Sequence, residues 1–254
     1  MPQNIQPEVF IKMVLSNWEL QNTRMNNLLE NLTDEQLASE TAPGRNTGMY
    51  LLEYEMKEES LIISGTLSLS ELFYEKIIET DDNSPTINLL YTIKNISNDV
   101  RHFLWKLHAA LQIKEGDQLM TTAKKAKVVD SEYSRFASFD EFVWPMIEGV
   151  NASIIPSKNN TMDFFYLYGT AIGEMELLSA DESSVFRYSY DKNIFPYQWY
   201  FASYGKFLDH YSAILEPCTA MPISVNDTIK LNQCSVLKPN EELNTVVKIY
   251  AGPH

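Results

Sequence analysis

The feature of this sequence that most constrains its fold is a long succession of short, β-branched segments separated by turn residues. From about Leu52 onward, segments such as 86–95 (TINLLYTIKN) and 244–252 (NTVVKIYAG) partly alternate apolar and polar residues, and turn-forming pieces such as 81–85 (DDNSP) precede or follow them. Strands at this spacing, bounded by Gly, Pro, Asn and Asp, are typical of an antiparallel β-sandwich or barrel. The sequence therefore predicts a mainly β domain over residues 52–254.

The residues ahead of this domain follow a different pattern. Apolar residues recur at helical spacing between Val9 and Leu32, and Pro7 suits the start of a helix. A loop rich in Pro and Gly follows at 42–48 (APGRNTG). The sequence therefore predicts a short N-terminal α-helical segment over residues 1–51.

Charge and cysteine usage narrow the expected partners and location. The chain of 254 residues has a formal net charge of −14, and a surface this acidic repels phosphate backbones and anionic lipid, so we expect no nucleic-acid or membrane partner. The N-terminus lacks the basic and apolar regions of a signal peptide. Cys218 and Cys234 are too few for a disulfide framework. These features predict a cytoplasmic protein with two reduced thiols.

We predict no metal site and no cofactor. Among the four histidines, His102 and His108 would share one face of an extended strand, but they would lie about 20 Å apart at ~3.3 Å per residue, too far to bind one metal ion. The sequence has no H-E-x-x-H, C-x-x-C or G-x-S-x-G motif and no Gly-rich phosphate loop. Metal chemistry and nucleophilic-serine chemistry therefore have little support.

Glu216 and His108 are candidates for a catalytic base and a catalytic acid. Glu216 ends the run YSAILE directly before Pro217, and period-two alternation places His108 on one face of FLWKLHAAL together with Lys106. By residue type alone, each is more often a partly exposed strand residue than a catalytic group. A carboxylate and a histidine within hydrogen-bond reach can, however, move protons on a neutral substrate near pH 7. Spacing alone leaves both interpretations open.

Three segments resemble parts of the galactose mutarotase-like (aldose 1-epimerase) family. The first leads to an asparagine before a turn, Asn95, in SELFYEKIIETDDNSPTINLLYTIKNISND. The second carries His108 in VRHFLWKLHAAL. The third places Glu216 in an LEP tract after an aromatic PY-x-W, in FPYQWYFASYGKFLDHYSAILEPCTAMPISVND. The segment SVLKPNEELNTVVKIYAG, near the end of the chain, resembles the family's L-x-P-G-E turn and final strand.

This resemblance implies a fold and a reaction. The family's fold is a large antiparallel β-sandwich, or supersandwich, with a sugar groove on one concave face. Its chemistry interconverts the α and β anomers of an aldose. By similarity, Glu216 is the general base that takes the anomeric hydroxyl proton, and His108 is the general acid that protonates the ring oxygen. Such acid–base catalysis needs no cofactor.

Four further residues are weaker candidates for binding the sugar. The ring of Trp199 or Trp105 is expected to stack on a sugar face, although a Trp in the core is at least as common. Asp191 and Arg187 lie upstream of the third segment and are candidates for contacts with hydroxyl groups. Solvated loop charges are the commoner alternative for both.

The N-terminal part departs from the family. Residues 1–51 stand where the family has its leading strands, so these strands are missing. The piece NWELQNTRMNNLLENLTDEQLASETAPGRNTGMYLL instead resembles the opening of DinB-like four-helix proteins. Those proteins continue into a GHL whose histidine helps to bind a metal, whereas this chain reads YLLEYEM. The sequence therefore predicts a DinB-like fragment without its metal ligand.

The sequence leaves three functions to weigh. The first is an aldose 1-epimerase-like isomerase that uses Glu216 and His108. The alternative is a catalytically impaired carbohydrate-binding module, because missing strands would leave one wall of the groove unbuilt. A DinB-like metal protein is the remote third. Missing strands also expose sheet edges, which predicts homodimerisation or poor solubility unless the N-terminal helices cover them.

Overall fold

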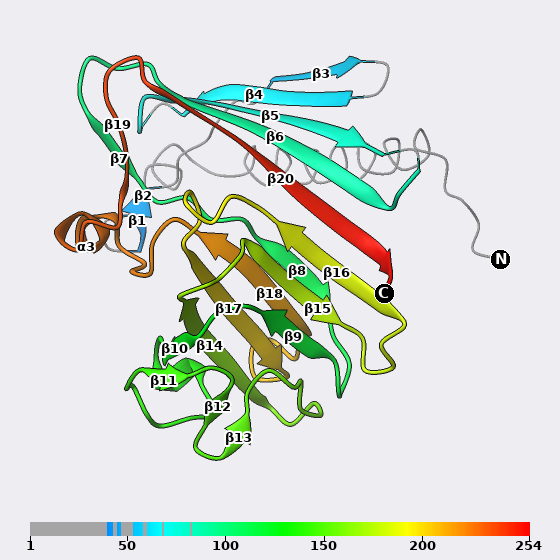
Figure 1. Cartoon of the computed structure of the whole chain (residues 1–254). Coiled ribbons are helices and arrows are strands. Elements are labelled where there is room, and N and C mark those ends of the chain that lie inside the picture. Colours follow the sequence, from blue (N-terminus) through cyan, green and yellow to red (C-terminus); the bar gives the residue numbers. More distant parts are fainter. Residues whose placement is uncertain (1–39, 43–44, 47–52, 58–59, 68, 82) are drawn as a thin grey trace.

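The computed structural model describes residues 40–42, 45–46, 53–57, 60–67, 69–81 and 83–254. Its main body is two antiparallel sheets packed face to face (Figure 1). The larger sheet has eight strands, in the order β3 (Glu53–Lys57), β4 (Ser60–Leu67), β5 (Leu72–Thr80), β6 (Thr86–Asn95), β20 (Glu242–Pro253), β16 (Ser184–Ser189), β15 (Glu174–Leu178) and β9 (Gln118–Thr121). The smaller sheet has six, in the order β11 (Phe142–Val143), β10 (Lys125–Val128), β14 (Thr161–Tyr168), β17 (Tyr197–Tyr204), β18 (Tyr211–Cys218) and β8 (Ala109–Gln112).

Short elements complete the described fold. Three pairs form small two-stranded sheets: β1 (Glu40–Ala42) with β2 (Arg45–Asn46), β12 (Met146–Ile147) with β13 (Val150–Asn151), and β7 (Arg101–Phe103) with β19 (Ser235–Leu237). Within the described residues, the helices are the 3-10 turn η1 (Ser131–Tyr133) and α3 (Val225–Lys230). No helix in the described ranges is long and apolar enough to cross a membrane.

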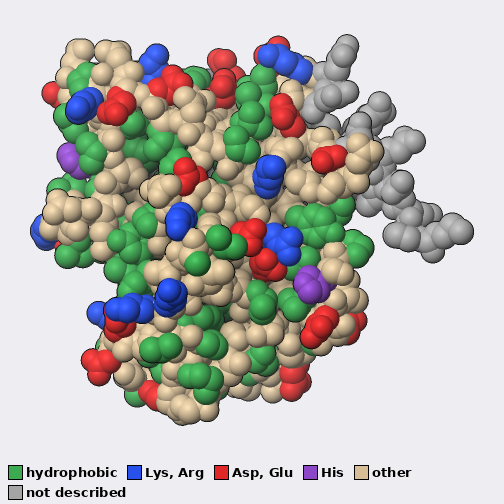
Figure 2. Space-filling view, in the orientation of Figure 1, with side chains coloured by type: hydrophobic (Ala, Val, Ile, Leu, Met, Phe, Trp, Pro, Cys, Tyr) green, Lys and Arg blue, Asp and Glu red, His purple; other side chains and the backbone are tan. Residues whose placement is uncertain are grey.

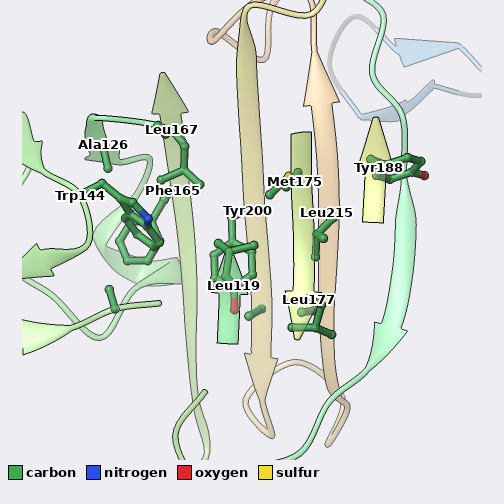
Figure 3. Close-up of a cluster of buried hydrophobic side chains, with 14 of the residues drawn as sticks. Leu119, Ala126, Trp144, Phe165, Leu167, Met175, Leu177, Tyr188, Tyr200 and Leu215 are labelled. Atoms are coloured by element: carbon green, nitrogen blue, oxygen red, sulfur yellow. The ribbon is translucent and has the colours of Figure 1, made fainter. Parts of the chain in front are cut away.

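The core lies between the two sheets. Strand alternation turns Tyr200 of β17 and Leu215 of β18 inward, where they meet Met175 and Leu177 of β15 (Figure 3). Burying an apolar side chain of this size stabilises the folded state by about 1.5–3 kcal/mol. The smaller sheet therefore has one face in the core, and its other face is available to carry a site.

The mainly β sandwich predicted from the sequence is confirmed. The segment 86–95 is β6, and 244–252 lies within β20. These two strands pair with each other. In the turn 81–85, the Asp81 carboxylate accepts a hydrogen bond from the Asn83 N–H at 2.9 Å. Alternation and turn chemistry were therefore sufficient to find these elements.

The extended strand on which His102 and His108 would share one face is broken in the structure. β7 ends at Phe103 and β8 begins at Ala109, and between them Lys106 forms only an isolated bridge with Cys218. The reason lies on the neighbouring strand β18. Leu107 donates its N–H to the Pro217 carbonyl at 2.9 Å, but Pro217 has no N–H that could donate to Leu107 in turn. The pairing with β18 therefore becomes regular only beyond this point.

The N-terminal prediction is tested at few positions. The helices expected within residues 1–39 lie outside the described residues. Further along, 40–42 and 45–46 form the antiparallel pair β1–β2, so this stretch is a strand pair where a helical segment and a loop were expected.

Asn95 closes the turn after β6. Its side chain is fully buried, donates to the carbonyls of Asp99 at 2.7 Å and Leu237 at 3.0 Å, and accepts from the N–H and hydroxyl of Ser97. All of its bonding capacity is used within the fold. The structure therefore gives this asparagine a role in holding the β6–β7 turn against β19.

Candidate active site

The candidate site is built on the outer face of the six-stranded sheet. Ala213 and Leu215 of β18 point into the core, so Glu216 points to the opposite face. Its cross-strand partner on β17 is Trp199. The Glu216 side chain is nevertheless only 4% exposed, because neighbouring side chains cover it.

Two basic side chains converge on Glu216 from the irregular segment between β7 and β8. The Lys106 ammonium donates to Oε2 at 2.7 Å. The His108 Nε2 lies 3.6 Å from Oε1, too far for a hydrogen bond but close enough to form one after a small movement. The His108 side chain is 51% exposed, so the carboxylate is buried while the imidazole faces solvent.

Trp199 is held in place beside this group. The residue is 3% exposed, and its Nε1–H donates to the Ala220 carbonyl at 2.9 Å. The Lys106 ammonium sits over the indole, 4.6 Å from the ring centroid, a favourable cation–π distance. This face of Trp199 therefore carries an ammonium group in the structure, and stacking of a sugar there requires Lys106 to move.

The structure does not bring the other predicted contacts to Glu216. Trp105 packs in the core with Tyr91 and Phe195, at 5.0 and 4.8 Å between ring centroids. Asp191 is exposed, and its carboxylate accepts from the Asn193 N–H at 2.8 Å.

Arg187 lies on the other sheet. It donates to Glu176 at 2.7 Å, on the face of β16 opposite to the core-facing Tyr188. Among the predicted substrate contacts, only Trp199 therefore belongs to the same cluster as the predicted acid and base.

Comparison with known proteins gives a fold but no sequence match. No protein-family model and no curated protein matches the chain. A solved structure of a candidate aldose 1-epimerase from Klebsiella pneumoniae aligns with a TM-score of 0.62 at 12% identity, over 83% of this chain and 59% of that one. A candidate aldose 1-epimerase from Escherichia coli K12 aligns with the same TM-score and identity, over 82% and 70%. A galactose mutarotase-like protein from Clostridium acetobutylicum aligns at 0.58 and 13%, over 82% and 68%.

The chain has a galactose mutarotase-like fold. At this identity the likeness concerns the fold, and the chain spans under two thirds of the Klebsiella structure. The comparisons give no support to the DinB-like interpretation of residues 1–51. Among the described residues there is also no group of three or more His, Cys, Asp and Glu side chains that could hold a metal ion.

In this mutarotase-like sandwich, the residue that the sequence interpretation missed is Lys106. The available signal was its period-two relation to His108, which places both side chains on one face. That relation could not show which carboxylate they meet, because Glu216 follows more than a hundred positions later in the chain. Tertiary pairing of β18 with β8 supplies this contact.

The negative charge of Glu216 also affects the pKa of a tyrosine in the core of the mutarotase-like fold. Burial raises the pKa of Tyr188 to about 12, and the negative charge of Glu216 adds to the shift. Burial likewise raises the pKa of the Cys218 thiol to about 12. Cys218 therefore stays a neutral thiol near pH 7, which agrees with the predicted reduced state.

Proposed function

We propose that this protein is an aldose 1-epimerase-like isomerase that interconverts the anomers of an aldose. The observation that carries the proposal is the approach of the His108 imidazole to a buried carboxylate, with 3.6 Å between Nε2 and Oε1 of Glu216. In an aldose, the anomeric hydroxyl and the ring oxygen are bonded to the same carbon. An acid and a base this close together suit two oxygens that share one carbon.

The proposed reaction balances without a cofactor. Glu216 takes the proton of the anomeric hydroxyl, the C1–O1 bond becomes a carbonyl, and the C1–O5 bond breaks. O5 receives the proton of the His108 imidazolium. The aldehyde then rotates about its bond to C2, O5 attacks the other face of C1, and both protons return along the same routes. One group starts ionised and the other protonated, which is the arrangement that general acid–base catalysis requires.

Lys106 has a positioning role in this proposal. Its bond to Oε2 fixes the carboxylate so that Oε1 is the oxygen nearer to His108. Oε1 therefore keeps a free lone pair for the substrate. Because His108 is half exposed and Glu216 is covered, the aldose would approach past the imidazole and reach the carboxylate last.

The direct test is the decay of optical rotation of fresh α-glucose or α-galactose. Proton transfer by a placed side chain typically contributes about 10²–10⁴-fold, so we expect His108→Gln to lower the catalysed rate at least about a hundredfold. His102→Gln is a matched control, because His102 is exposed on β7 outside the cluster. A His108→Gln enzyme with unchanged rate would remove this residue from the mechanism.

A second function is favoured by one observation. The Lys106 ammonium occupies both Oε2 of Glu216 and the face of Trp199, which suits a carbohydrate-binding module with impaired catalysis. Sugar-dependent thermal stabilisation without faster mutarotation would favour this alternative.

A cytoplasmic location, a homodimer and the absence of a nucleic-acid partner stay predictions. On the face drawn in Figure 2, acidic and basic side chains are interspersed and form no continuous basic area.

A further inference from the structure

A pocket lies on the same outer face of the six-stranded sheet as Glu216. Its cavity volume is about 290 Å³, and Tyr168, Thr170, Asn193 and Tyr197 are among its lining residues. Tyr168 ends β14 and Tyr197 begins β17, and the two are cross-strand partners. Ligand pockets in proteins start at about 300 Å³, so this one has room for a single small ring.

The strand register places this pocket beside the candidate site. Tyr197 pairs with Cys218, and two residues further along each strand Trp199 pairs with Glu216. Side chains two residues apart share one face, so Tyr197 and Glu216 both point outward. With ~3.3 Å per residue and ~4.8 Å between strands, their Cα atoms lie roughly 8 Å apart. A ring linked to a sugar held at Glu216 can therefore reach the pocket.

The lining is chemically suited to a neutral sugar ring. Tyr168 and Tyr197 are both half-buried, and an aromatic ring offers a flat apolar face to the C–H groups of a sugar. The Tyr168 hydroxyl donates to the Glu141 carboxylate at 2.5 Å, which fixes the ring. Thr170 and Asn193 supply neutral hydrogen-bonding groups.

Two lysines and one carboxylate lie at or near the pocket. The Lys192 ammonium donates to the Ala171 carbonyl at 2.8 Å. Lys125, the cross-strand partner of Tyr168, forms an ion pair with Glu141 at 2.7 Å. Beyond its bond to the Ala171 carbonyl, the Lys192 ammonium keeps two N–H groups that can donate to the hydroxyls of a sugar.

We propose that the Tyr168–Tyr197 pocket is a second sugar subsite, which binds the ring attached to the aldose that Glu216 and His108 act on. This inference rests on the proposed function and names its substrate class. The substrate is the reducing end of a neutral disaccharide or longer oligosaccharide, in preference to a free monosaccharide.

The test compares kcat/KM for mutarotation of glucose with kcat/KM for cellobiose, maltose and lactose. We expect at least one disaccharide to exceed glucose by about twofold to tenfold, the range of a single stacking contact with an aromatic ring. Tyr197→Ala should abolish this preference, and Tyr197→Phe should retain it because the ring is kept. Tyr133→Ala, at an exposed tyrosine of η1, is the matched control and should leave the preference unchanged.

The outcomes separate this inference from the proposed function. Mutarotation of glucose without preference for any disaccharide, or a preference that survives in Tyr197→Ala, would overturn the subsite and leave the isomerase in place. If no sugar is epimerised, calorimetric titration of the same sugars decides. Disaccharide binding that is lost in Tyr197→Ala supports the subsite, and no binding of any disaccharide overturns it.

Discussion

Two buried carboxylates of the six-stranded sheet, Asp163 and Glu216, differ in how fully their oxygens are bonded. Asp163 on β14 is fully buried on the core side. It accepts the backbone N–H of Arg135 at 3.1 Å, two guanidinium N–H groups at 2.9 and 2.7 Å, and the Tyr204 hydroxyl at 3.0 Å. Every donor has good geometry, so the group has little capacity left for a ligand.

Glu216 is buried almost as deeply but is bonded far less completely. Lys106 donates to one oxygen, whereas the other oxygen lies 3.6 Å from the His108 Nε2, beyond hydrogen-bond distance. A covered carboxylate with an unfilled acceptor and a half-exposed imidazole beside it is poised for a substrate, whereas a saturated one serves the fold. Burial alone does not distinguish a structural carboxylate from a candidate catalytic one. The number of hydrogen bonds that the carboxylate oxygens accept does distinguish Asp163 from Glu216.

The largest effect on stability is expected at the saturated carboxylate. Arg135→Met leaves Asp163 buried without its cation, so we expect a loss of about 3–5 kcal/mol in the free energy of unfolding, measured by urea denaturation. The control is Arg187→Met, which removes a more exposed ion pair with Glu176 and should cost under about 1 kcal/mol. Equal losses in the two variants would contradict the assignment of Asp163 as a structural centre.

An intermediate effect is expected at Lys106, and it should appear in activity. A hydrogen bond between charged groups contributes about 1.5–3 kcal/mol, so Lys106→Met should lower kcat about tenfold to a hundredfold with little change in KM. Lys106→Arg should recover part of the loss, and Lys230→Met, from an exposed pair on α3, should have no effect. A faster Lys106→Met enzyme would instead show that this lysine obstructs the site.

The smallest effect concerns pH and reports on the core side of Glu216. The pKa of Tyr188 is raised from 10.0 to about 12, so above about pH 10 its phenol ionises in the unfolded chain before it does in the folded one. Stability is therefore lost as the pH rises from about 10 to 12. At about pH 11 this amounts to about 1.4 kcal/mol for the one group.

The measurement is the melting temperature between about pH 9 and 11. The melting temperature of Tyr188→Phe should fall less steeply with rising pH than that of the unmodified protein. The melting temperature of Tyr133→Phe, at an exposed position, should fall as that of the unmodified protein does. Parallel curves for all three proteins would mean that Tyr188 does not couple to alkaline unfolding.

The sequence was informative where local rules decide the structure. Alternation located β6 and β20, and the period-two relation placed Lys106 and His108 on one side of the chain. The predicted acid and base came from the family resemblance, since no local rule joins His108 to a residue that lies so far along the chain. The structure brings their side chains close together.

The remaining features depend on tertiary contacts or on one missing N–H. Trp105 and Trp199 looked equivalent in the sequence, yet one packs in the core and the other lies beside Glu216. Arg135 reaches Asp163 from the loop after η1, a contact without a sequence signal. The break before β8 follows from Pro217 on the neighbouring strand, which a period-two pattern in the segment itself cannot reveal.

The most direct test of the central claim is mutarotation of α-glucose, or of the favoured disaccharide, by Glu216→Gln. We expect the rotation to decay at nearly the buffer rate, while the melting temperature stays within a few degrees because the side chain keeps its shape. Glu176→Gln, which alters a partly buried ion pair on the other sheet, should retain the full rate. A Glu216→Gln enzyme that retains the rate of the unmodified protein would contradict the account.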